Sequence, residues 1–179
     1  MNLEKLYSIA KNHKDNHAGC GGEPYKSYNK LLDIIKKLND NNRQLKVLEI
    51  GTAVGFTTII LHNNLNQVDT IELHPEHIEL AKKNIQNWGG NIGKINFILG
   101  DAREILPNLE NKYDLIFFDG YGVKASYYEP FKVLLNTSGL LITANRHLKS
   151  SEQDYFEKLK LEDFEFIEEF ADTVVHRKL

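Results

Sequence analysis

Four acidic residues of this chain stand at or directly after the ends of apolar segments. They are Glu49, Glu72, Asp101 and Asp119. Carboxylates accept hydrogen bonds from amino and hydroxyl groups, and a carboxylate beside a reacting centre can also take up a proton. In open α/β sheets ligands bind at the carboxyl ends of the strands. The pattern therefore indicates a site for a polar ligand with the means to move a proton.

A short turn with a glycine at each end follows Glu49. The apolar run Val47–Ile50 precedes Gly51, and Gly55 opens a segment with helical spacing. Glycines let the backbone approach a ligand closely, and the N–H groups at a helix N-terminus favour an anionic group. A turn made for pyrophosphate would gain nothing from a carboxylate at its mouth, whereas a ligand that carries an amino group would. We therefore expect Glu49 to address an amino group, directly or through water.

Glu72 ends the next apolar segment and is followed by Leu73. It lies about 20 positions after the glycine turn, and a carboxylate at this spacing can accept hydrogen bonds from both hydroxyl groups of a ribose. The alternative is an ordinary acidic residue at a helix N-terminus, where the helix dipole stabilises its charge. The spacing favours the ribose ligand.

The segments that must position these residues alternate between strand and helix patterns. Strands are expected at 45–50, 68–73, 95–99, 113–119 and 138–143, and helical segments between them at 55–65, 75–88, 102–109 and 125–136. Strands separated by helix-length segments are typical of a parallel sheet built from βαβ units. Two further helices are expected at 3–13 and 24–38, on either side of a glycine-rich loop at 17–22.

The C-terminal end departs from this alternation. Residues 164–170 and 173–177 have strand patterns, and only Ala171 and Asp172 connect them. So short a connection permits only an antiparallel pair. The sequence therefore predicts an α/β fold in which a mostly parallel sheet ends in an antiparallel hairpin and carries helices on both faces.

The composition is that of a globular domain. The chain has 179 residues, 41% of them hydrophobic and 26% charged, and a formal net charge of −3. No apolar run reaches the roughly 18–20 residues that span a bilayer, and the N-terminus lacks a signal-peptide pattern. The single cysteine, Cys20, allows no disulfide within the chain and is typical of a reducing compartment. We expect one cytoplasmic domain over 1–179, with a helical cap at 1–40, a core at 45–179 and no membrane contact.

Over roughly residues 45–145 the chain resembles the class I S-adenosylmethionine (SAM)-dependent methyltransferases. The resemblance implies a Rossmann-like seven-stranded sheet with SAM as the cofactor. It also implies that Asp101 accepts a hydrogen bond from the adenine amino group, and Asp101 could cap the following helix as well. The residues implied in cofactor binding are Glu49, Gly51, Thr52, Ala53, Gly55, Phe56, Thr57, Glu72, Leu73, Gly100, Asp101, Ala102, Asp119 and Tyr121.

The region around Asp119 resembles the cation-dependent O-methyltransferases related to catechol O-methyltransferase. In that family the aspartate binds a divalent metal, a nearby lysine is the base, and an Asp-Asn pair follows the next strand. By position Asp119 matches the first ligand, Asn145 the asparagine, and Lys124 the lysine once two extra residues are allowed. Ala144 stands where the second carboxylate belongs. Mg²⁺ usually relies on one or two carboxylates, so we expect it to bind weakly or not at all, with Asp119 and Asn145 as candidate ligands.

The missing carboxylate leaves three hypotheses open. The protein could be a metal-independent enzyme in which Asp119, Lys124 or a histidine takes the proton. It could bind a metal only together with a chelating substrate, or it could bind SAM without catalysis. His147, two residues after Asn145, is the candidate histidine and has a side chain that titrates near neutral pH. The alternative is a loop histidine that is merely solvated.

Aromatic residues also follow Asp119. Tyr127, Tyr128 and Phe131 have helical spacing, which favours a place in the core. Tyr121 does not share this spacing, so we expect it to line the ligand pocket.

The function that these features favour is SAM-dependent methylation of an oxygen atom of a small-molecule acceptor. A tRNA nucleotide is the alternative acceptor, because some bacterial relatives modify tRNA, but nucleic acid is not favoured since the chain lacks a basic stripe. A catalytically silent SAM-binding protein is a further alternative. A nicotinamide-dependent oxidoreductase is disfavoured because Ala53 replaces the second glycine of the dinucleotide-binding pattern. Relatives often dimerise, so a homodimer is one possible state.

Overall fold

The computed structural model describes residues 27–39, 43–62, 66–146, 148–159 and 163–179, together with Glu4 and Ser8. The glycine-rich loop at 17–22, most of the helix expected at 3–13, and His147 lie outside the described residues. Within the described parts, every helix is too short or too polar to cross a lipid bilayer.

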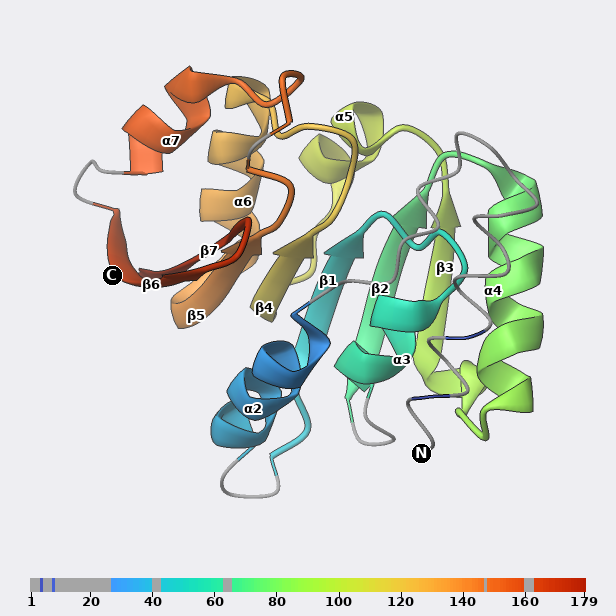
Figure 1. Cartoon of the computed structure of the whole chain (residues 1–179). Coiled ribbons are helices and arrows are strands. Elements are labelled where there is room, and N and C mark those ends of the chain that lie inside the picture. The colour runs from blue at the N-terminus through green and yellow to red at the C-terminus, as the bar shows by residue number, and fades with distance from the viewer. Residues whose placement is uncertain are drawn as a thin grey trace.

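A seven-stranded sheet forms the centre of the molecule, with the strands in the order β3-β2-β1-β4-β5-β7-β6 (Figure 1). The strands from β1 to β5 pair in parallel, and β7 is antiparallel to both β5 and β6. Their bounds are β1 Lys46–Ile50, β2 Gln67–Glu72, β3 Ile95–Leu99, β4 Tyr113–Phe118, β5 Leu135–Thr143, β6 Phe164–Phe170 and β7 Thr173–Lys178. The predicted α/β sheet with its C-terminal antiparallel hairpin is confirmed.

Helices cover both faces of the sheet (Figure 1). Those of the first face are α2 (Tyr28–Leu38), α3 (Phe56–His62) and α4 (Pro75–Asn87), and those of the second are α5 (Ala102–Ile105), α6 (Tyr128–Leu134) and α7 (Gln153–Leu159). Short 3-10 turns lie at Ile92–Lys94, Leu106–Asn108 and Ala125–Tyr127.

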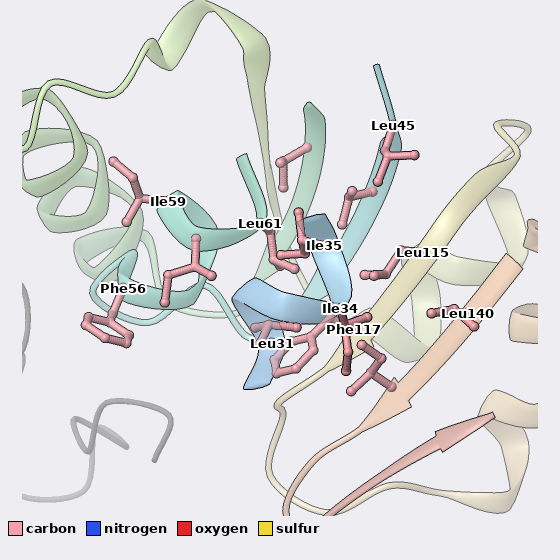
Figure 2. Packing of buried hydrophobic residues seen from close by; sticks show 14 of the residues in the cluster. Leu31, Ile34, Ile35, Leu45, Phe56, Ile59, Leu61, Leu115, Phe117 and Leu140 are labelled. Carbon is pink, nitrogen blue, oxygen red and sulfur yellow. The ribbon is translucent and has the colours of Figure 1, made fainter. Parts of the chain in front are cut away.

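Alternate residues of the buried strands point to opposite faces and so build two cores. Val47 and Leu115 belong to the core beneath α2 and α3, whereas Leu48 and Ile116 belong to the core beneath α6 and α7. Figure 2 shows the first core, where Leu31 and Ile35 of α2 meet side chains of α3 and of the strands. Because β1 and β4 are covered on both faces, only their ends can face a ligand.

The second core contains an aromatic cluster that the sequence predicted and a helix that it did not. Tyr127, Tyr128 and Phe131 are buried there, as their helical spacing predicted. The helix α7, in contrast, was not predicted, although Tyr155, Phe156 and Leu159 have the spacing of one apolar face and are buried. The polar flanks of this short helix obscured that signal.

The boundary between α6 and β5 also differs from the prediction. The helix ends at Leu134 and the strand starts at Leu135, three residues before the expected 138. Ser138 has a φ of +63° and the pairing with β4 shifts register nearby, between Tyr113 and Leu115. The early part of β5 is therefore an irregular extension that no alternation of polar and apolar residues marks.

Replacing Tyr155 by alanine tests whether α7 is part of the folded core. Tyr155 is fully buried and its hydroxyl lies 3.1 Å from that of Thr143. Loss of a buried aromatic side chain costs about 3–5 kcal/mol, and we expect Tyr155→Ala to lower the free energy of unfolding in urea by that amount. Val133→Ala, on the exposed side of α6, should change it by less than about 0.5 kcal/mol. Equal effects would contradict the packing of α7.

Candidate active site

The carboxyl ends of β2, β1, β4 and β5 lie side by side, because these strands are parallel neighbours in the sheet. Glu72, Glu49, Asp119 and Asn145 stand at or next to these ends. The structure thus brings together four of the residues that the sequence placed in one site. A ligand at this edge would meet carboxylates from three strands.

The turn after β1 passes very close to the end of β4. Gly51 has a φ of +102°, and a Cβ atom there would lie 2.8 Å from the backbone oxygen of Asp119. Its N–H group donates to the carbonyl of Ile71 over 3.0 Å. Ala53 and Gly55 also have positive φ values, +44° and +83°. Glycine at position 51 is therefore required by both its conformation and the lack of space.

Glu72 binds this turn directly. One carboxylate oxygen accepts the N–H of Ala53 over 2.9 Å. The other accepts the N–H of His74 over 3.0 Å and lies 3.2 Å from Nδ1 of His77. The contact with His77 was not predicted, because nothing in the spacing of the histidines points to Glu72. The alternative role at the start of α4 also has support, since His74 is the N-cap residue of that helix.

Glu49 is fully buried behind the turn. Its Oε2 accepts hydrogen bonds of 2.6 Å from the hydroxyls of Thr58 and Thr70. Its Oε1 is also buried and has no hydrogen-bond partner among the described residues. Burial raises the pKa of Glu49 to about 8, more than the two hydroxyls lower it. An unpartnered buried carboxylate oxygen fits the ammonium group that the sequence analysis assigned to this position.

Asp101 caps α5 by accepting the N–H of Arg103 over 2.8 Å, so the predicted capping role is confirmed. The Arg103 side chain also pairs with both carboxylate oxygens, and these hydrogen bonds lower the pKa of Asp101. An adenine amino group would have to share the acceptor with Arg103. Gly100, just before it, has a φ of +143° and donates its N–H to the carbonyl of Glu72 over 2.9 Å.

Three large side chains are exposed around these acids. They are Leu73 at 57%, Leu99 at 55% and Tyr121 at 87% exposure, which follow or end β2, β3 and β4. Leu73 and Tyr121 were predicted in the site, and Leu99 was not. Their apolar surface could cover the flat faces of a ligand.

Several other predicted cofactor residues are buried. Phe56 contacts Tyr28 edge-on in the first core, with ring centroids 5.9 Å apart, and Ala102 belongs to the second core. Thr57 is buried as well. The hydroxyl of Thr52 lies 2.5 Å from that of Thr70 and so takes part in the network around Glu49. For Phe56 and Ala102, only the backbone is available to a ligand.

Asp119 and Asn145 meet as predicted. The amide nitrogen of Asn145, a residue with a φ of +59°, donates to Oδ1 of Asp119 over 2.9 Å and to the carbonyl of Gly120 over 3.3 Å. Burial, together with the nearby charge of Asp172, raises the pKa of Asp119 to about 7, against the effect of the Asn145 hydrogen bond. A carboxyl group with such a pKa can exchange a proton near neutrality.

Lys124 is occupied elsewhere. Its ammonium donates to the carbonyl of Ser150 over 2.8 Å and lies 3.7 Å from the Glu152 carboxylate. Glu152 in turn accepts the N–H of Ala125 over 2.7 Å and donates its own N–H to the carbonyl of Val123 over 2.9 Å. We call residues 122–125 and 148–152, joined by these contacts, the loop clamp. Lys124 thus ties two loops together.

The metal site that the resemblance implies lacks its second carboxylate in this chain, because Ala144 stands in that position. Ala144 is 1% exposed and packs in the first core. Asn145 turns its amide N–H₂ group toward Asp119. Among the residues that the structure describes, no group of three or more His, Cys, Asp or Glu side chains is arranged to hold a metal ion. Asp119 and Asn145 would offer Mg²⁺ one carboxylate and one neutral amide, and weak binding remains the expectation.

Comparison with solved structures supports the same class of fold. A Staphylococcus aureus protein crystallised as a candidate caffeoyl-CoA O-methyltransferase is 25% identical, with a TM-score of 0.76 over 99% of this chain and 92% of that one. A Bacillus cereus O-methyltransferase, solved in complex with S-adenosylhomocysteine (SAH), is 18% identical, with a TM-score of 0.74 over 99% of this chain and 90% of that one. The fold and the grouped acids therefore define a Rossmann-like methyltransferase domain.

The sequence comparisons give the family. Residues 25–167 match the family model described as O-methyltransferase. A Mycobacterium tuberculosis catechol O-methyltransferase is 32% identical over 108 residues, which are 58% of this chain and 49% of that protein. The chain belongs to the O-methyltransferase family, as the resemblance predicted. It spans about half the length of the curated relatives that it matches.

The close approach of Gly51 to β4 can be tested by Gly51→Ala. Gly89 is a matched control, because it has a φ of +83° but nothing within 4 Å of the position that a Cβ atom would take. We expect Gly89→Ala to cost about 1–2 kcal/mol from backbone strain alone. Gly51→Ala should cost about 2–4 kcal/mol, since overpacking adds to that strain. Urea unfolding measures both, and equal losses would mean that the turn has room to move.

Proposed function

We propose that this protein binds SAM and transfers its methyl group to an oxygen atom of a small-molecule acceptor. The observation that carries the proposal is the glycine turn held by Glu72 over a buried Glu49 whose Oε1 has no described partner, in a chain of the O-methyltransferase family. Bound SAM supplies an electrophilic methyl group on a sulfonium. The single cysteine, typical of a reducing compartment, supports a cytoplasmic location.

In this proposal, different residues bind different parts of the cofactor. Glu49 faces the ammonium group, and Glu72 accepts from the ribose hydroxyls with the lone pairs that its contacts to Ala53, His74 and His77 leave free. Asp101 shares its carboxylate between Arg103 and the adenine amino group. The exposed Leu73, Leu99 and Tyr121 cover the apolar parts of the ligand.

Asp119 takes the proton of the acceptor. During transfer of the methyl group that SAM would supply, with SAH as the leaving group, the acceptor hydroxyl would lose its proton to the Asp119 carboxylate. Asn145 orients that carboxylate through the 2.9 Å hydrogen bond. The raised pKa keeps Asp119 a stronger base than an exposed aspartate. The ammonium of Lys124 serves the loop clamp in this scheme.

Binding of SAH tests the cofactor. We expect micromolar affinity by titration calorimetry, with and without added Mg²⁺, and a loss of at least about tenfold in Glu72→Ala, since one lost hydrogen-bonding carboxylate is worth about 1.5–3 kcal/mol. Glu79→Ala, which removes an exposed carboxylate of α4 paired with Lys82, should bind normally. Absence of binding to the unchanged protein would overturn the proposed function.

The pH dependence of turnover tests the base. A base must be unprotonated, so kcat should rise as pH increases through about 7 and then level off, as the pKa of Asp119 implies. Asp119→Asn should lower kcat by about 10²-fold or more, and EDTA should leave turnover unchanged. Radiolabelled SAM with a panel of hydroxylated acceptors, and with bulk tRNA in a parallel assay, measures these rates.

Lys124→Gln separates the two candidate bases. It removes the ammonium from the loop clamp but leaves Asp119 in place, so we expect an altered KM with an unchanged pH profile. A profile abolished by Lys124→Gln and retained by Asp119→Asn would assign the base to Lys124 instead.

A further inference from the structure

The two carboxylate oxygens of Glu49 differ in their hydrogen bonding. Its Oε2 is saturated by two short hydroxyl hydrogen bonds, from Thr58 and Thr70. Its Oε1 is buried without a described partner. A proton on Oε1 makes the side chain neutral while both hydroxyls continue to donate to Oε2.

The charges around Glu49 favour this neutral form. The neighbouring charged groups are Asp119 at the end of β4 and Glu72 at the end of β2, and both are acidic. Its contacts on α3 and β2 are the neutral hydroxyls of Thr58 and Thr70, and the buried side chains of α2 on the same face are apolar. Burial with no cation nearby among the described residues disfavours a carboxylate, which agrees with a pKa of about 8 for Glu49.

The glycine turn is connected to this carboxyl group. Thr70 gives its only hydroxyl proton to Glu49, so it must accept from Thr52 across their 2.5 Å contact. Thr52 stands inside the turn, one residue after Gly51. A ligand seated on the turn therefore lies over a chain of hydrogen bonds that ends at Glu49.

We propose that Glu49 is protonated in the ligand-free protein and gives up its proton when the ammonium group of the cofactor binds. Cofactor binding is thus coupled to proton release, and the affinity of the site for the cofactor increases as pH rises. The inference rests on the proposed function in that it needs a ligand with an amino group at the glycine turn. It adds that Glu49 changes its charge to meet that group.

Titration calorimetry at pH 7 in two buffers, phosphate and Tris, measures the coupling, because the difference in buffer ionisation enthalpy reports the protons released. We expect nearly one proton released per SAH bound to the unchanged protein. Glu49→Gln should bind SAH more weakly and release almost no protons per SAH bound. Methylthioadenosine, which keeps the adenine, ribose and sulfur of SAH but lacks the amino acid portion, should release almost none from either protein.

The outcomes separate the two proposals. Failure of the unchanged protein to bind SAH would overturn the proposed function. Binding of SAH with no proton release, or with the same release in Glu49→Gln, would overturn this inference and leave the function intact.

A second measurement needs no ligand. A carboxyl group whose pKa is higher in the folded than in the unfolded protein stabilises the fold at low pH, and this contribution is lost as pH rises from about 4.5 to about 8. The melting temperature of the unchanged protein should therefore fall more steeply between pH 5 and pH 9 than that of Glu49→Gln. Parallel curves would show that Glu49 is already ionised without a ligand.

Discussion

The backbone path of the turn after β1 is the constraint on which the rest of the site depends. Hydrogen bonds hold it from both sides, since Gly51 donates to Ile71 of β2 and Asp119 donates to Ile50 of β1, at 3.0 and 2.9 Å. There is no room for a side chain at Gly51. The ends of three strands are thereby fixed relative to one another, and with them Glu49, Glu72 and Asp119.

The acidic residues at the two ends of the sheet differ in how fully their carboxylates are hydrogen-bonded. At the far end, Asp69 accepts from the hydroxyl of Tyr113 over 2.6 Å and from Asn96 over 3.2 Å, and Asp114 accepts from Arg43, Asn136 and the N–H of Lys46. These carboxylates are satisfied by the fold itself. At the carboxyl end, Glu49 keeps a buried oxygen without a described partner. Buried polar groups are normally hydrogen-bonded, and Glu49 Oε1 is the only carboxylate oxygen among the described buried side-chain atoms that lack a partner, which points to a ligand at this end of the sheet.

The sequence predicted the parts of this structure that follow from local patterns. The parallel strands, the terminal hairpin and the meeting of Asp119 with Asn145 rest on apolar periodicity and on residues at strand ends. The contact of Glu72 with His77 and the attachment of Lys124 to Ser150 were not predicted, because each depends on how a side chain is turned in three dimensions. The start of β5 was missed for a similar reason, since a residue with positive φ interrupts the strand pattern.

The loop clamp joins the two segments that follow β4 and β5. In addition to the hydrogen bonds of the clamp, Gly122 packs so closely on Ser150 that a Cβ atom at position 122 would collide with Ser150. The two segments therefore pack against each other and form one wall that follows Asp119 and Asn145 in the chain. If the acceptor lies beside Asp119 as proposed, an acceptor of a different shape would require changes in both segments, and substrate range would depend on the pair of loops and on the Lys124 and Glu152 side chains between them.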